Sequence, residues 1–188
     1  MTFGTFSGLS ASFPLMIKAL YGGFEGAPDP LAYAFYGPLI GSASRVLFGF
    51  IADKTGGAIL TTIAGMGIAI CSTLLIILGL VAPGSMEQFP MFVAIMLSIF
   101  FFTGIGNAAT FRQFPIIFGK NPRQAGGVIG WTAAVAAYGP FIFATLIGAV
   151  IKANGNAKLF FSGLLAFVII ATFVNWYYYN RKGCEAPS

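Results

Sequence analysis

Arg45 is the residue whose chemistry most needs an explanation in this sequence. It lies in an apolar stretch, from about Leu31 to Ala52, that is long enough to cross a bilayer as a helix. At 1.5 Å per residue, Arg45 lies roughly 12 Å from Asp53 at one end, within the middle third of a hydrocarbon core about 30 Å thick. A charge at that depth is costly unless a partner compensates it. Arg45 is therefore a candidate binding residue.

Three arrangements would lower the cost of a charged Arg45 inside the membrane. A structural ion pair needs a carboxylate at similar depth, yet all five acids fall outside the predicted spans: Glu25, Asp29, Asp53, Glu87 and Glu185. Snorkelling to the membrane surface is the second, from a rather deep position. The third is a bound planar anion, which the planar fork of guanidinium donors suits well. We predict anion binding and leave a structural role open.

The helix around Arg45 has two distinct faces. At 100° per residue, six residues share the face of Arg45, and all but Phe48 are small: Pro38, Gly41, Ser42, Phe48, Gly49 and Ala52. The bulky residues lie opposite and are expected to face lipid or neighbouring helices: Leu39, Ile40, Val46, Leu47, Phe50 and Ile51. A charged group thus projects from a stripe of small residues, and Gly41 and Ser42 are predicted to line the substrate site with it.

Composition sets the class of protein. Of 188 residues, 57% are hydrophobic and 8% charged, whereas a soluble domain averages about 25% charged. The net charge of +5 is carried by few, scattered residues, which indicates membrane topology rather than nucleic-acid binding. The chain has no His, and its two cysteines suggest no disulfide framework. With no nucleophile–base pair and no cluster of metal ligands, we predict neither an enzyme, nor a metal site, nor a cofactor.

We predict an all-α membrane protein with six transmembrane helices. The hydrophobic runs place them at about residues 2–21, 31–52, 58–81, 89–111, 126–151 and 159–179. The second is followed by the turn DKTGG, and the last ends in aromatic and then basic residues. One side of the membrane carries six basic residues (Lys54, Arg112, Lys120, Arg123, Arg181, Lys182) and the other three (Lys18, Lys152, Lys158). Both termini are therefore predicted to be cytoplasmic.

Two further segments carry candidate functional groups. Asn107 lies in the fourth span among small residues (TGIGNAAT), and an amide at that depth needs partners. It either ties two helices together or touches a substrate or gate. The fifth span, from Gly127 to Phe143, is rich in small residues and contains a Gly-Pro break. It either packs closely against other helices or forms a path lined by backbone.

These segments together resemble the C-terminal half of a NarK-like nitrate/nitrite porter of the major facilitator superfamily. FGTFSGLSASFPLMIK is similar to the seventh helix of that family, and YAFYGPLIGSASRVLFGFIADKTGG to its eighth helix and following turn. GIGNAATFRQFPIIF resembles the tenth helix, and the fifth span resembles the glycine-rich eleventh-helix signature. The turn is a superfamily-wide motif with Asp53 and Gly57 at its ends, whereas the seventh- and eighth-helix matches are specific to the family.

The resemblance implies roles for particular residues. Arg45 corresponds to the arginine that grips the anion, Phe3 to an aromatic wall of the site, and Asn107 to a residue on the central path. In the eleventh-helix signature, used for gating, four positions fit: Gly130, Ala134, Gly139 and Phe141. Ala136 and Pro140 stand where the family prefers glycine.

The resemblance also implies a partner and a mechanism. A full porter has twelve spans in two halves, with the site between them, so this chain is expected to need a missing N-terminal half that carries a second arginine. We expect alternating-access transport in the bacterial inner membrane, with nitrate exchanged for nitrite, since no membrane carboxylate or His offers a proton carrier. Another small anion as substrate, or a non-transporting membrane scaffold, are the alternatives.

Overall fold

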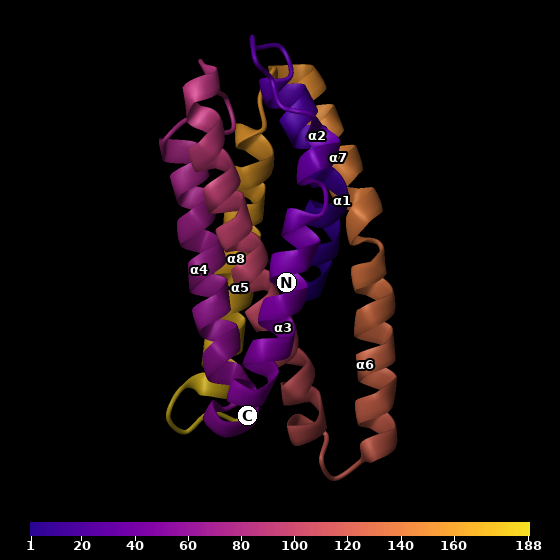
Figure 1. Cartoon of the computed structure of the whole chain (residues 1–188). Coiled ribbons are helices and arrows are strands. Elements are labelled where there is room, and N and C mark those ends of the chain that lie inside the picture. Colours follow the sequence, from indigo (N-terminus) through magenta and orange to yellow (C-terminus); the bar gives the residue numbers. More distant parts are fainter.

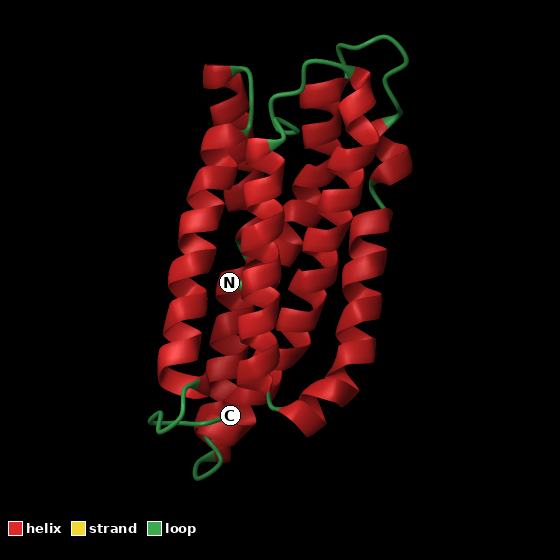
Figure 2. Cartoon of the chain, turned by 90° about the vertical axis from the view of Figure 1, so that its left-hand side faces the viewer, coloured by secondary structure: helices red, strands yellow, loops and turns green.

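The computed structural model describes all 188 residues as a bundle of helices, with no strand. The long helices run roughly along one axis, and the loops gather at the two ends of the bundle (Figures 1 and 2). The α-helices are α1 (Thr2–Tyr21), α2 (Pro30–Tyr33), α3 (Tyr36–Thr55), α4 (Gly57–Ile77), α5 (Phe89–Ile117), α6 (Pro122–Ala137), α7 (Gly139–Asn154) and α8 (Lys158–Asn175). A 3₁₀ turn, Met86–Gln88, precedes α5, and a π-helical turn, Trp176–Asn180, follows α8.

Five helical segments are long and apolar enough to cross a membrane: Pro30–Thr55, Gly57–Ile77, Met86–Ile117, Pro122–Asn154 and Lys158–Asn180. The expectation of an all-helical membrane protein is thus confirmed. The predicted first span, α1, is not among the five, because hydroxyl residues and glycines lower its hydropathy. It lies against α5 and α7, with Thr2, Thr5 and Ser12 buried. The count of six spans stays a prediction.

Helix ends differ from the predicted spans at several places. The second predicted span is interrupted at Ala34 and Phe35, between α2 and α3. The DKTGG turn is shorter than predicted, because α3 continues through Thr55. The chain reverses at Gly56 alone, whose φ of 95° is a conformation that residues with a Cβ rarely adopt. The third predicted span ran to residue 81, whereas α4 ends at Ile77. The fourth ran to Phe111, whereas α5 continues to Ile117.

The fifth predicted span is broken at Tyr138 into α6 and α7. Pro140 has no backbone N–H, so the carbonyl of Ala136 loses the donor that a continuous helix would supply. The Ser7 hydroxyl on α1 donates to that carbonyl at 3.1 Å. A polar group released inside the bundle is thereby satisfied by a neighbouring helix, as the membrane interior requires.

The main core of the bundle is built from buried residues of α1, α4, α5 and α8. Its centre is aromatic: Phe13 and Phe100 pack edge to face at 5.7 Å, and Tyr21 lies 5.1 Å from Phe92 between ring centroids. The Tyr21 hydroxyl donates to the carbonyl of Leu80 at 2.8 Å, which fastens the end of α1 to the loop after α4. The N-terminus lies at mid-height in the bundle, and the C-terminus lies at the end that holds the α3–α4 turn (Figure 1).

Helices α3 and α5 approach each other closely at Gly104. A Cβ there would overlap the Ser44 hydroxyl and the carbonyl of Gly41. The Ser44 hydroxyl is buried and donates to the carbonyls of Gly41 at 3.0 Å and Phe101 at 3.1 Å. This contact fixes the height of α3 against α5, and therefore of the side chains that follow on both helices.

Candidate anion site

The Arg45 side chain is exposed on α3 and lies beside an aromatic ring of α5. Its Cζ is 5.7 Å from the centroid of Phe111, within the roughly 6 Å over which a cation is attracted to an aromatic face. The Phe111 ring meets Phe3 of α1 edge to face at 5.9 Å. Three helices thus contribute a guanidinium and two aromatic rings to one series of contacts.

Arg45 borders a shallow depression of about 360 Å³ between α3 and α5. Its other polar wall residues are Asp53 and Arg112, which form an ion pair of 2.7 Å between Oδ1 and Nε. That pair is the only ion pair in the chain, so no carboxylate lies against Arg45. The two arginines and one aspartate leave this depression with a net positive charge.

The small residues near Arg45 divide into two groups. Gly41 is buried, and a Cβ there would overlap the Phe6 ring, so its position favours close packing of α3 over contact with an anion. Ala52 is buried as well. Ser42 is exposed, and a Cβ on Gly49 would meet no atom within 4 Å. The open space beside Arg45 is therefore bordered by Gly49, whereas Ser42 does not line it.

The bulky residues of α3 are exposed, but Val46 and Phe50 border the same depression as Arg45 and do not lie wholly on the opposite side, as the periodicity had predicted. Val46, Leu47 and Phe50 are 65%, 64% and 71% exposed. An apolar surface of this extent is normally covered by lipid or by other helices.

Asn107 is buried to 1% exposure, one helical turn before Phe111 on the same face of α5. Its Oδ1 has no hydrogen-bond partner, and its amide makes no hydrogen bond to another helix. The structure therefore shows no side-chain hydrogen bond by which Asn107 would tie two helices together. A buried polar atom without a partner costs roughly 1–3 kcal/mol, which makes it a candidate for contact with water or with a ligand.

The signature residues of the fifth predicted span fall into an exposed group and a packed group. Gly130 and Ala134 lie exposed on α6, and a Cβ on Gly130 would meet nothing within 4 Å. Ala136, Gly139 and Pro140 form the break between α6 and α7. A Cβ on Gly139 would come within 2.5 Å of the carbonyl oxygen of Gly4. The chain is therefore closely packed at the break, whereas α6 presents an open face.

Asp53 and Gly57, the ends of the superfamily turn, lie against α5. Asp53 makes the ion pair with Arg112, and a Cβ on Gly57 would come within 2.6 Å of the carbonyl oxygen of Ala109. The turn thus fastens the ends of α3 and α4 to α5. No group of three His, Cys, Asp or Glu residues that could hold a metal ion exists in the chain.

Two residues of this region were not predicted from the sequence. Phe111 is the ring that contacts both Arg45 and Phe3, and its position four residues after Asn107, on one helix face, is the signal that would have indicated it. Ser7 supports the α6–α7 break, and only the tertiary contact reveals it.

Comparison with known proteins relates the chain to transporters over its whole length. No protein-family model matches it. It is 60% identical over 187 residues to the probable nitrate/nitrite antiporter NarK2 of Thermus thermophilus, with 100% of the chain and 41% of that protein covered. It is 30% identical over 203 residues to the nitrate/nitrite transporter NarU of Escherichia coli K12 (96% and 42% covered), and 29% identical to NarU of Salmonella typhimurium LT2. The chain therefore spans less than half the length of the curated relatives it matches.

The helical fold with its membrane-length apolar segments defines an integral membrane protein. The relatives described above are named as transporters, and none as an enzyme. Over its whole length, the chain is similar to part of proteins that are named as nitrate/nitrite antiporters or transporters.

Proposed function

We propose that this chain is the C-terminal half of a porter that exchanges nitrate and nitrite across the membrane by alternating access. Two lines of support are independent of each other. The first is that the relatives are named as nitrate/nitrite transporters. The second is that Arg45 is exposed on an open face of the bundle and has no carboxylate partner. The observation that carries the proposal is this unpaired arginine.

The geometry around Arg45 suits a small flat anion. The guanidinium lies over the Phe111 ring, and both border the open depression between α3 and α5. Nitrate oxygens accept hydrogen bonds from such a planar fork, and charge-assisted bonds of this kind are roughly twice as strong as neutral ones. Phe111 and Phe3 supply apolar walls that keep water away from the anion, and Asn107 supplies a buried amide one turn away on α5.

We propose that the missing N-terminal half covers the open face of α3 and α6. The exposed apolar residues on these helices and on the start of α7 include Phe50, Trp131 and Phe141, at 71%, 70% and 72% exposure. In porters of this architecture the binding site lies between two such halves. An arginine from the other half would then complete a clamp whose first jaw is Arg45.

Exchange follows from the permanent charge of Arg45. A guanidinium is not deprotonated in proteins, so an empty carrier would have to move an uncompensated charge through its closed state. A carrier that is loaded with an anion in both directions avoids that cost.

We further propose six spans with both termini cytoplasmic, since the basic ends of α3, α5 and α6 lie at the same end of the bundle as the C-terminus (Figure 1).

Transport by the complete two-half porter tests the proposal. In proteoliposomes loaded with nitrite, Arg45→Ala is expected to abolish nitrate uptake. Arg45→Lys is expected to retain only part of it, because an ammonium lacks the planar fork. Arg123→Ala is the matched control, since this arginine is exposed in the first turn of α6, away from the depression. Uptake that survives in Arg45→Ala at the level of the control would refute the proposal.

A further inference from the structure

The chain after α8 carries an arginine that lies over an aromatic ring. The π-helical turn Trp176–Asn180 follows α8, and Arg181 comes directly after it. The Cζ atom of Arg181 lies 3.9 Å from the centroid of the Tyr177 ring, a distance at which a cation is attracted to an aromatic face. The ring thus fixes the guanidinium at this end of the helix.

The part of α8 that leads to this ring is apolar and exposed. Ile170, Phe173 and Tyr177 follow one another at intervals of three and four residues, so they share one face of the helix. The ring centroids of Phe173 and Tyr177 lie 6.1 Å apart. All three side chains are exposed, and together they form the exposed stripe of α8.

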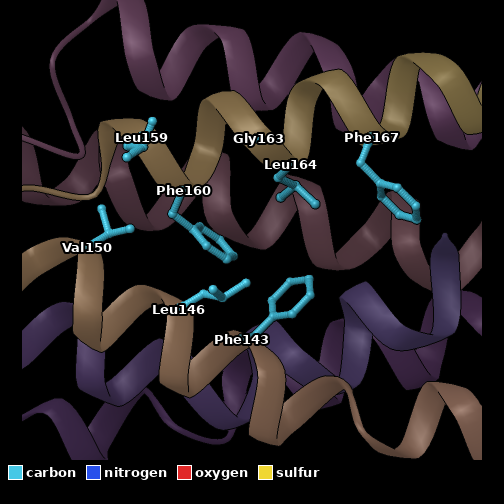
Figure 3. Close-up of a pocket in the computed structure, with 8 residues that line it drawn as sticks. All are labelled: Phe143, Leu146, Val150, Leu159, Phe160, Gly163, Leu164 and Phe167. Atoms are coloured by element: carbon cyan, nitrogen blue, oxygen red, sulfur yellow. The ribbon is translucent and has the colours of Figure 1, made fainter.

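Helix α7 borders α8 only before this stripe. Side chains of the two helices, among them Phe143 and Phe160, face each other across an apolar groove (Figure 3), and the last α8 residue that lines this groove is Phe167. From Ile170 to Tyr177 the exposed stripe spans roughly 10 Å at 1.5 Å per residue. One leaflet is roughly 15 Å thick, half of a hydrocarbon core of about 30 Å, so the stripe fits within one leaflet.

The charge of Arg181 has no partner in the chain. The only ion pair joins Arg112 and Asp53, so Glu185, the one acidic residue after α8, does not pair with Arg181. The Nε atom of Arg181 is buried and has no hydrogen-bond partner, and a buried polar group of this kind calls for an acceptor. An apolar stripe that ends at an unpaired guanidinium is complementary to a molecule with an apolar tail and an anionic head.

We propose that Arg181 binds the phosphate of an anionic phospholipid, with one acyl chain lying along the exposed stripe of α8. Tyrosine rings gather at the surface of a membrane, which is the level at which a lipid phosphate lies. A guanidinium forms charge-assisted hydrogen bonds with phosphate oxygens. The site involves neither Arg45 nor the depression beside it, so it holds or fails independently of the transport proposal.

Native mass spectrometry of the complete two-half porter with phosphatidylglycerol or phosphatidylcholine tests this proposal. We expect phosphatidylglycerol to be retained preferentially, and Arg181→Gln to reduce that preference about fivefold. Lys54→Gln is the matched control and is expected to leave the preference unchanged. It removes the same charge from an exposed residue in the last turn of α3, at the same end of the bundle.

Phe173→Ala tests the acyl chain. It is expected to weaken the retention of both lipids, because it removes apolar surface from the exposed stripe. Binding of free phosphate at Arg181 would not depend on Phe173.

Three outcomes would overturn the proposal. They are equal retention of the two lipids by the unmodified protein, a preference that Arg181→Gln reduces no more than Lys54→Gln does, and unchanged retention in Phe173→Ala. Circular dichroism of each variant shows whether its helical content is preserved. Phe173 and Lys54 are exposed and Arg181 lies after the last helical turn, so these substitutions are expected to leave the fold intact.

Discussion

Gly104→Ala is expected to destabilise the bundle and to displace Arg45 from Phe111. The new methyl group would overlap the Ser44 hydroxyl and the carbonyl of Gly41, and it would lie 3.0 Å from the Gly41 carbonyl carbon. Backbone atoms cannot rotate away, so α3 and α5 must separate. Overpacking of this kind costs about 1–3 kcal/mol. For a chain of this size, each kcal/mol lowers the unfolding midpoint by about 2–4 °C.

Gly130→Ala is the matched control for this substitution. It makes the same chemical change within a helix, at a position where a Cβ meets nothing within 4 Å. Both variants gain the same helix propensity, about 1 kcal/mol, so the difference between their midpoints isolates the overlap. That difference is measured by heating each purified protein to a series of temperatures and determining, by size-exclusion chromatography, the fraction that remains folded. If Gly104→Ala unfolds at the same temperature as Gly130→Ala, the close α3–α5 contact is not as described.

Three further predictions concern neighbouring contacts. Phe111→Leu is expected to weaken nitrate binding by the value of the lost cation–π contact, about 0.5–2 kcal/mol, which a nitrate titration of the complete porter measures; an unchanged affinity would contradict it. Asp53→Asn is expected to change the unfolding midpoint little, because its ion pair with Arg112 is about half exposed (45% and 54%) and such pairs contribute about 0–1 kcal/mol; a large drop would show that the pair matters more. Gln113→Ala is expected to cost about 1–3 kcal/mol, since its buried Nε2 donates to the Thr61 hydroxyl at 2.7 Å, and a midpoint equal to that of the unmodified protein would count against it.

The positions of the apolar runs predicted where the helices lie, but not how the helices are interrupted. The predicted span of residues 2–21 agrees with α1, because the apolar run there has the length of the helix. The break at Gly139 and Pro140 was indicated by the missing N–H of proline. The hydroxyl of Ser7 that satisfies it comes from a helix 129 residues earlier in the sequence, and no local pattern reveals such a partner.

An arginine without a carboxylate partner could be predicted from the sequence, whereas its surroundings could be predicted less well. The depth of Arg45 and the distribution of acids indicated an unpaired cation, and the structure places no carboxylate against it. Helical periodicity put Gly41 and Ser42 on one face with Arg45, yet Gly41 is buried under Phe6 while Ser42 is exposed. Periodicity gives the angle of a residue around its own helix, whereas the neighbouring helices decide which part of that face is covered.

The most direct test of the account is a structure of the complete two-half porter with nitrate bound. The account predicts a nitrate oxygen about 2.7–2.9 Å from a guanidinium nitrogen of Arg45, with Phe111 still beside the guanidinium. A carboxylate from the other half seated against Arg45, or an Arg45 side chain directed to the lipid headgroups with nitrate bound elsewhere, would contradict it.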